Sequence, residues 1–159
     1  MPTPLMRGDP APDFTMSTDN GGRVGLGDFR GSNLVLYFYP KDNTPGCTSQ
    51  ARDFAARADE FRQAGAHLVG VSPDPAARHD KFKAKYGLPF VLASDEDHVT
   101  SCAYGVWVEK RMYGRRFMGI ERTTFLIDGE GRIARVWPKV KVAGHVEEVL
   151  DAARDLARP

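Results

Sequence analysis

Residues 34–48 read LVLYFYPKDNTPGCT, and this stretch decides both the fold class and the chemistry of the chain. Its first part, 34–39, is a continuous apolar run of the kind that forms a strand in the middle of a sheet. Pro45 and Gly46 are turn formers, and Cys47 follows them where an amphipathic pattern begins. The stretch therefore predicts a buried strand, a turn, and a helix that carries Cys47 in its first turn.

This position makes Cys47 a candidate nucleophile. Unpaired backbone N–H groups and the helix dipole at the start of a helix favour the thiolate, which is the reactive form of cysteine. The alternative is that Cys47 is a small buried apolar residue, as most free cysteines are. The turn formers before Cys47, and the hydroxyls of Thr44 and Thr48 beside it, favour a reactive cysteine.

The rest of the chain alternates strands and helices. We expect helices over 47–63, 75–86, 95–104 and 146–156, and strands over 67–72, 89–92, 123–127 and 133–136. Hairpin turns are expected at 20–22 and 128–131. Asp74 and Pro75 suit the N-cap and first turn of a helix, and Gly65 suits a helix end. This order predicts an α/β sandwich with a mixed sheet.

Composition limits the classes of function. The chain has 159 residues and a formal net charge of +1, which suits one domain over 1–159 and favours neither nucleic acid nor a membrane as partner. No apolar run has the length of a signal peptide core or a membrane span. Two cysteines without a secretory signal predict thiols in a reducing cytoplasm. Without a Cys-x-x-Cys motif, and with scattered histidines, they make a poor zinc site, so we expect no metal and no cofactor.

Several motifs resemble those of a known family. Pro40, Thr44 and Cys47 match the Pro-x-x-x-Thr-x-x-Cys signature of peroxiredoxins. The segments that resemble the bacterioferritin comigratory protein, or peroxiredoxin Q, subfamily are YFYPKDNTPGCT (37–48), LASDEDH (92–98), YGVW (104–107), RTTFLID (122–128) and VKVAGHVEEVL (140–150). The resemblance covers nearly the whole chain. It implies an α/β thioredoxin-like fold, with a central mixed sheet flanked by helices.

The resemblance also implies an activity and a site. A thiol-dependent peroxidase of this kind reduces hydrogen peroxide and organic hydroperoxides as an antioxidant, with Cys47 as the peroxidatic cysteine. The backbone N–H groups of Cys47 and Gly46 would donate to the peroxide. Thr44 would bridge sulfur and peroxide, Pro40 would wall the pocket against water, and the charge of Arg122 would favour the thiolate.

One departure from the subfamily concerns the second cysteine of the reaction. Many members carry a resolving cysteine five positions after the nucleophile, where this chain has Arg52, and others carry it in the next helix, where residues 78–85 include none. The other thiol of the chain is Cys102. It is a bystander, a resolving cysteine reached by local unfolding, or a partner in an intermolecular disulfide. We favour a one-cysteine mechanism.

The expected partners are a peroxide and a reducing thiol such as thioredoxin or glutaredoxin, and the expected state is a monomer or weak homodimer. Two other functions stay open. The chain could be an atypical two-cysteine peroxidase that uses Cys102, or a thioredoxin-like redox sensor without efficient turnover. A general thiol–disulfide oxidoreductase is disfavoured, because that chemistry usually needs Cys-x-x-Cys.

The four histidines receive no catalytic role. His67 opens a strand, His79 lies in a charged helix, and His145 precedes the last helix. We expect His98 to serve local capping and hydrogen bonding. The acidic run 95–97 is interpreted as a helix start rather than a metal site.

Overall fold

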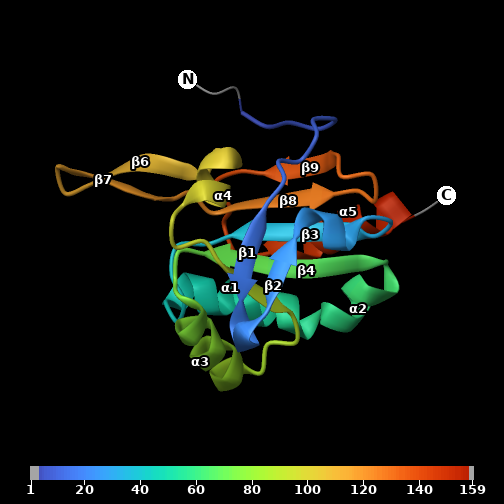
Figure 1. Cartoon of the computed structure of the whole chain (residues 1–159), viewed down its shortest axis with the longest axis horizontal. Helices are drawn as coiled ribbons and strands as arrows, with labels where there is room; N and C mark the ends of the chain where they lie inside the picture. The colour runs from blue at the N-terminus through green and yellow to red at the C-terminus, as the bar shows by residue number, and fades with distance from the viewer. Residues whose placement is uncertain (1–3, 158–159) are drawn as a thin grey trace.

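The computed structural model describes residues 4–157, which build one seven-stranded sheet, a separate two-stranded hairpin and helices packed on the large sheet (Figure 1). The order of the large sheet is β2-β1-β5-β4-β3-β8-β9. Its strands are β1 (Thr15–Thr18), β2 (Arg23–Gly25), β3 (Asn33–Phe38), β4 (Ala66–Ser72), β5 (Val91–Ser94), β8 (Thr123–Ile127) and β9 (Ile133–Trp137).

The sheet is mixed, as the sequence predicts. Strands β3, β4 and β5 are parallel, whereas β8 pairs antiparallel with β3 and β1 pairs antiparallel with β5. Because β3 lies between two neighbours and is covered on both faces, both of its faces must be apolar. Alternate side chains of β3 enter two separate cores. Val35 and Tyr37 pack on one face, and Leu34 and Leu36 on the other.

Helices cover the first of these faces. They are α1 (Pro45–Ala56), α2 (Ala58–Gln63), α3 (Ala76–Tyr86) and α5 (His145–Ala157), and each contributes apolar side chains to the core that contains Val35 and Tyr37. The opposite face is covered by residues of the β1–β2 hairpin and of the segment after α4 (Val99–Ala103), including Met16, Tyr104 and Val106.

Several expected boundaries shift for local reasons. The helix expected over 47–63 is two helices, because Arg57 leaves helical geometry with φ −111° and ψ 8°. The strand expected over 89–92 begins at Val91, two residues after Pro89, whose nitrogen cannot donate to a ladder. Asp74 does not cap α3, since its carboxylate accepts hydrogen bonds from Ser72 and Asp42 instead. The helix expected over 95–104 is reduced to α4.

The hairpin of β6 (Trp107–Met112) and β7 (Arg115–Ile120) was not expected. It forms a sheet of its own and projects away from the body of the molecule (Figure 1). It leads directly into Glu121, Arg122 and β8, so it leaves the fold at the edge where β3 ends and β8 begins. Among the described residues, no helix has the length and apolar character needed to cross a membrane.

Candidate active site

Cys47 lies where the sequence predicts it, in the first turn of α1 after the loop that follows β3. Its side chain is 2% exposed and packs in the core on the helix-covered face. Thr44 occupies the N-cap position, and its carbonyl accepts the first helical hydrogen bond, from the N–H of Thr48. The N–H groups of a first helical turn have no acceptor within the helix, so those of Gly46 and Cys47 suit an oxygen ligand.

Arg122 joins the thiol from the start of β8. Its Nη2 donates to Cys47 Sγ at 3.2 Å, and its Nη1 donates to Gln50 Oε1 at 2.6 Å. Gln50 is fully buried one turn after Cys47, so α1 supplies both the sulfur and the group that orients the guanidinium. Gly46 makes room for this approach, because a Cβ there would lie 3.3 Å from Nη2. The guanidinium thus places a fixed positive charge beside the buried sulfur of Cys47.

Gln50 was missed by the sequence analysis. Its spacing of three residues from Cys47 placed it on the same helix face, which is the signal that could have found it. Its Nε2 is buried and has no hydrogen-bond partner among residues 4–157. The amide therefore keeps a donor free beside the sulfur and the guanidinium.

Thr44 and Pro40 lie on the loop between β3 and α1. The hydroxyl of Thr44 donates to the carbonyl of Lys41 at 2.8 Å and makes no capping bond to α1. Its oxygen keeps lone pairs that can accept from a bound peroxide. Pro40 is half-buried two residues after the end of β3. No hydrogen bond joins Thr44 to Cys47 in the part of the chain that the structure describes.

The same loop is held by a buried network centred on Asp42. One carboxylate oxygen accepts from Tyr39 Oη at 2.6 Å, and the other lies 2.6 Å from Nδ1 of His79 on α3. The backbone N–H of Asp42 donates to Asp74 Oδ2 at 2.7 Å. Asp42, Tyr39 and His79 are all at most 2% exposed. The loop before Cys47 is therefore tied to β3, to α3 and to the end of β4.

His79 is a link that the sequence analysis did not foresee, because it only placed this residue in a charged helix and gave it no role. Its ring is 0% exposed, and Nε2 lies 3.0 Å from the carbonyl oxygen of Ala93. A carbonyl oxygen only accepts, so Nε2 carries a proton. Nδ1 shares a hydrogen bond with the Asp42 carboxyl group. His79 therefore links Asp42 to Ala93 of β5 through one hydrogen bond at each ring nitrogen.

Two tyrosines near the site stay neutral. Burial, and then the nearby Cys47 sulfur, raise the pKa of Tyr37 well above its usual value. Burial is also the largest cause that raises the pKa of Tyr39. Tyr37 stacks on Phe54 with ring centroids 4.6 Å apart, so the aromatic core of α1 and β3 continues up to the thiol.

His145 is the first residue of α5 and lies close enough to Arg122 to feel its charge. Burial lowers the pKa of His145 from 6.5 to about 4, and the charge of Arg122 adds to this shift. Its Nε2 lies 2.8 Å from the hydroxyl of Thr124. His145 is therefore neutral near pH 7 and adds no second positive charge beside Arg122.

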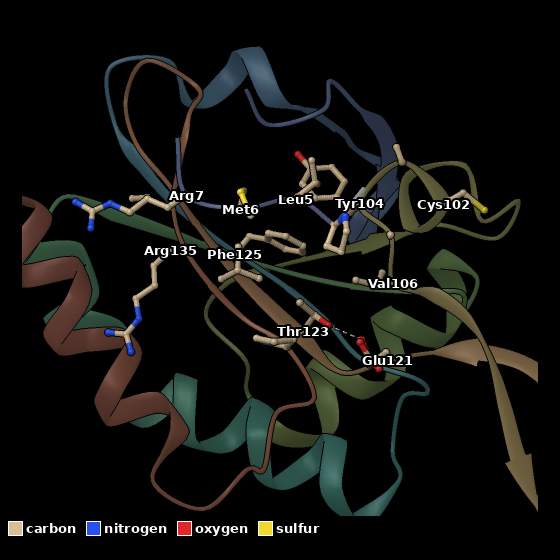
Figure 2. A pocket seen from close by; sticks show the side chains of 16 residues that line it. Leu5, Met6, Arg7, Cys102, Tyr104, Val106, Glu121, Thr123, Phe125 and Arg135 are labelled. Carbon is tan, nitrogen blue, oxygen red and sulfur yellow. Dashed lines mark hydrogen bonds between the residues drawn. The ribbon is translucent and has the colours of Figure 1, made fainter. Parts of the chain in front are cut away.

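Cys102 lies on the opposite side of the sheet. It is exposed on α4, and its neighbours Tyr104 and Val106 belong to the core away from the helices. Figure 2 shows it at one end of a pocket that also contains Phe125, with its sulfur directed away from the ring. Arg52 is exposed on α1, as expected. The structure therefore brings Cys47 and Arg122 together but separates Cys102 from both.

The acidic run 95–97 and His98 serve α4, though not as expected in detail. The Asp95 carboxylate accepts from the backbone N–H groups of Thr100 and Ser101, so it stabilises the helix start. His98 makes no side-chain capping bond, which corrects the expectation. Its ring instead stacks on Trp107 at a centroid distance of 3.8 Å.

Comparisons with known proteins agree with this geometry. Residues 7–136 match the model of the AhpC/TSA family. The chain is 48% identical over 150 residues to peroxiredoxin Bcp of Bacillus subtilis, which covers 94% of this chain and 96% of that protein. It is 51% identical over 143 residues to a putative peroxiredoxin bcp of Coxiella burnetii, with 90% and 95% covered.

Solved structures show the same likeness. Peroxiredoxin Q of Xanthomonas campestris matches with a TM-score of 0.88 and 47% identity, over 91% of this chain and 92% of that one. A cysteine-to-serine mutant of Xylella fastidiosa PrxQ matches with a TM-score of 0.92 and 39% identity, over 99% and 100%. Another structure concerns alkyl peroxide reduction by the Xanthomonas bacterioferritin comigratory protein.

Replacing His79 with alanine tests the buried network. The change leaves the Asp42 carboxylate buried without its partner, so the free energy of unfolding should fall by about 3–5 kcal/mol. Urea unfolding measures this loss. Lys81→Ala on the same helix is the control, because Lys81 is exposed and its loss should cost under about 0.5 kcal/mol. Equal stability of the two variants would contradict the role given to the pair.

His145 predicts a pH dependence of stability. Because its pKa is about 4 in the folded chain and 6.5 when unfolded, only the unfolded chain binds a proton between these values. Stability should therefore fall as the pH drops from 6.5 to 4, by up to about 3 kcal/mol from this group. His145→Gln should flatten this part of the stability profile, whereas His67→Gln, at an exposed site, should not. Identical slopes in the two variants would exclude this assignment.

Proposed function

The chain belongs to the AhpC/TSA family and is a thiol-dependent peroxidase like its peroxiredoxin Bcp relatives; on this basis we propose that Cys47 is its nucleophile and that an external thiol reduces it. The observation that carries the proposal is the 3.2 Å hydrogen bond from Arg122 to Cys47 Sγ. One thioredoxin-like domain over 1–159 would carry out both the reduction of the peroxide and the regeneration of Cys47. This activity would contribute to cell redox homeostasis.

In the first half-reaction the Cys47 thiolate attacks the terminal oxygen of a hydroperoxide. A sulfur–oxygen bond forms, the oxygen–oxygen bond breaks, and the leaving oxygen takes a proton to become water or an alcohol. Cysteine becomes a sulfenic acid as the peroxide is reduced by two electrons. Arg122 and the N–H groups of Gly46 and Cys47 would stabilise the charge that develops on the oxygens, and the hydroxyl oxygen of Thr44 would accept a hydrogen bond from the O–H of the peroxide. Pro40 would limit the access of water.

In the second half-reaction an external thiol condenses with the sulfenic acid, and water leaves. A second thiol then attacks the mixed disulfide, which restores Cys47 and releases the oxidised reductant. Two external thiols thus supply the two electrons that the peroxide received. We expect the reductant to be thioredoxin, glutaredoxin or a similar thiol, in the cytoplasm, and the enzyme to act as a monomer or weak homodimer.

The position of Cys102 supports the external route. A disulfide needs Cα atoms within about 7 Å of each other. Cys47 is buried on the helix-covered face, whereas Cys102 is exposed beyond the other face, so the sheet lies between them. Helix α3, the alternative location in relatives, has the sequence AARHDKFKAKY and no cysteine. A pairing of Cys47 with Cys102 would require both segments to leave their packing.

Arg122→Met tests the charge beside the thiol. Without the guanidinium the thiolate loses its nearest cation, and alkylation of Cys47 by iodoacetamide at neutral pH should slow about tenfold. Peroxide reduction should slow at least as much, because the oxygens also lose a donor. Arg52→Met is the matched control, since it removes an exposed arginine from α1. Equal alkylation rates in the two variants would remove Arg122 from the site.

Replacement of each cysteine tests the route of reduction. Cys47→Ser should abolish peroxide turnover and keep the fold, because the thiolate alone supplies the nucleophile. Cys102→Ser should keep most of the turnover with dithiothreitol as reductant. Excess peroxide should convert Cys47 to the sulfinic acid, since no internal thiol intercepts the sulfenic acid. Mass spectrometry of the treated chain detects each product.

The opposite results are equally definite. Turnover in Cys47→Ser would refute Cys47 as the nucleophile. A stoichiometric Cys47–Cys102 peptide pair within the monomer, after one equivalent of peroxide, would establish the two-cysteine mechanism instead. Single oxidation without repeated turnover, in the presence of thioredoxin or dithiothreitol, would favour the redox sensor.

A further inference from the structure

The β6–β7 hairpin exposes more apolar surface than any other described segment. Within residues 4–157 six large apolar side chains are strongly exposed, and four of them lie on this hairpin. They are Met112, Tyr113, Phe117 and Met118. The hairpin has no strand partner beyond its own two strands, and its base is anchored by buried Ile120. Such a two-stranded ribbon gains little stability from its own contacts, so its exposed apolar side chains call for a role outside the fold.

The tip of the hairpin is held in an unfavourable backbone conformation. Tyr113 and Gly114 both have positive φ, 52° and 77°, as in the type I′ turns that join two strands. The first position of such a turn favours Asn, Asp or Gly, whereas a bulky side chain there is an outlier. Tyr113 is also 98% exposed. An aromatic side chain that is both strained and almost fully exposed suits a contact outside the described fold.

Cations surround this apolar tip on both faces of the ribbon. Cross-strand pairs share a face, so Lys110 and Phe117 lie on one face with Met112 and Arg115, while the pair Arg111 and Arg116 lies on the other. Against these four cations the hairpin carries one carboxylate, that of Glu109, which lies 3.8 Å from Arg116. Lys110, Arg111 and Arg115 have no ion-pair partner in the described chain.

We propose that the β6–β7 hairpin docks, tip first, on an anionic lipid surface. Tyr113 and Met112 would enter the headgroup region, where aromatic and apolar side chains are stabilised. The cations on both faces would then meet lipid phosphates. A protein partner with a flat acidic surface would engage one face of the ribbon and leave the cations of the other unpaired. A lipid surface entered end-on neutralises both.

Docking of the hairpin goes beyond the peroxidase chemistry and does not depend on it, although the choice of substrate would rest on the proposed function. The near-zero net charge of the whole chain argued against a membrane, but that average conceals the local excess of cations on the hairpin. Arg122 follows the end of β7 by two residues, so docking would hold the Cys47 edge of the sheet toward the lipid. Hydroperoxides formed on lipid chains would then be the nearest substrates.

Vesicle flotation of the full-length chain tests the proposal. The chain should float with vesicles of equal parts phosphatidylglycerol and phosphatidylcholine but not with phosphatidylcholine alone, and added salt should release it. Tyr113→Asn should lower the partition coefficient about tenfold, because it removes the apolar tip. Asn-Gly is the preferred pair for a type I′ turn, so this variant should unfold at the same or a higher temperature.

Two charge variants complete the design. Lys110→Gln and Arg115→Gln should each lower the partition coefficient about fivefold. Arg23→Gln, which removes an exposed cation from β2, should leave it unchanged. Cys47→Ser should float like the unaltered chain, so a failed catalytic proposal would not affect this result.

Three outcomes would overturn the proposal. One is the absence of flotation with anionic vesicles at low salt. Another is equal flotation of the unaltered chain and Tyr113→Asn. The third is a loss of protein binding in Tyr113→Asn while vesicle binding stays the same. This loss would appear as the disappearance of a concentration-dependent dimer, or as a KM that rises for thioredoxin but not for dithiothreitol. That last result would assign the hairpin to a protein partner.

Discussion

The buried hydrogen bonds of Asp42 are the interaction on which the site depends. The loop between β3 and α1 must hold a desolvated sulfur next to Arg122, and neither a strand ladder nor a helix stabilises that loop. Asp42 stabilises the loop instead. Its carboxyl group bonds to Tyr39 and His79, and its backbone N–H donates to Asp74. Since a half-satisfied buried network is worse than an apolar one, the partners act as a unit. The position of Cys47 beside Arg122 thus rests on packing across three elements.

Alternation along β3 explains why the two cysteines are separated. Successive side chains of a strand point to opposite faces, so the faces of a central strand form different cores. Arg122 immediately precedes β8, Thr124 and Leu126 lie on it, and all three side chains share the face of Cys47. Cys102 is exposed on α4, next to Tyr104, which packs on the other face of the sheet. The geometry of the sheet therefore supports the one-cysteine proposal, in addition to the presence of Arg52 where many relatives carry a cysteine.

The sequence alone predicted the features that depend on local pattern. The apolar run 34–39 predicted a strand buried on both faces, and the turn formers before Cys47 predicted its place in α1. Arg122 required the family resemblance, because nothing local links it to Cys47. His79 and Gln50 were missed for the same reason. The partner of His79 is Asp42 and that of Gln50 is Arg122, and both partners are distant in sequence. The hairpin after Trp107 was missed because its charged residues weaken the apolar alternation that signals a strand.

The proposed reduction of a buried Cys47 by an external thiol sets opposing demands on this fold. Attack on peroxide requires the closed loop, since the field of Arg122 acts most strongly where water is excluded. Reduction by an external thiol requires the sulfur of Cys47, 2% exposed, to become accessible. Under this proposal, tighter pairing in the network of Asp42 and His79 would favour peroxide reduction, and looser pairing would favour recovery from the sulfenic acid. The proposed external reduction would work best with a loop that is closed at rest and opens after oxidation, when a neutral sulfenic acid would hold the guanidinium less strongly than a thiolate would.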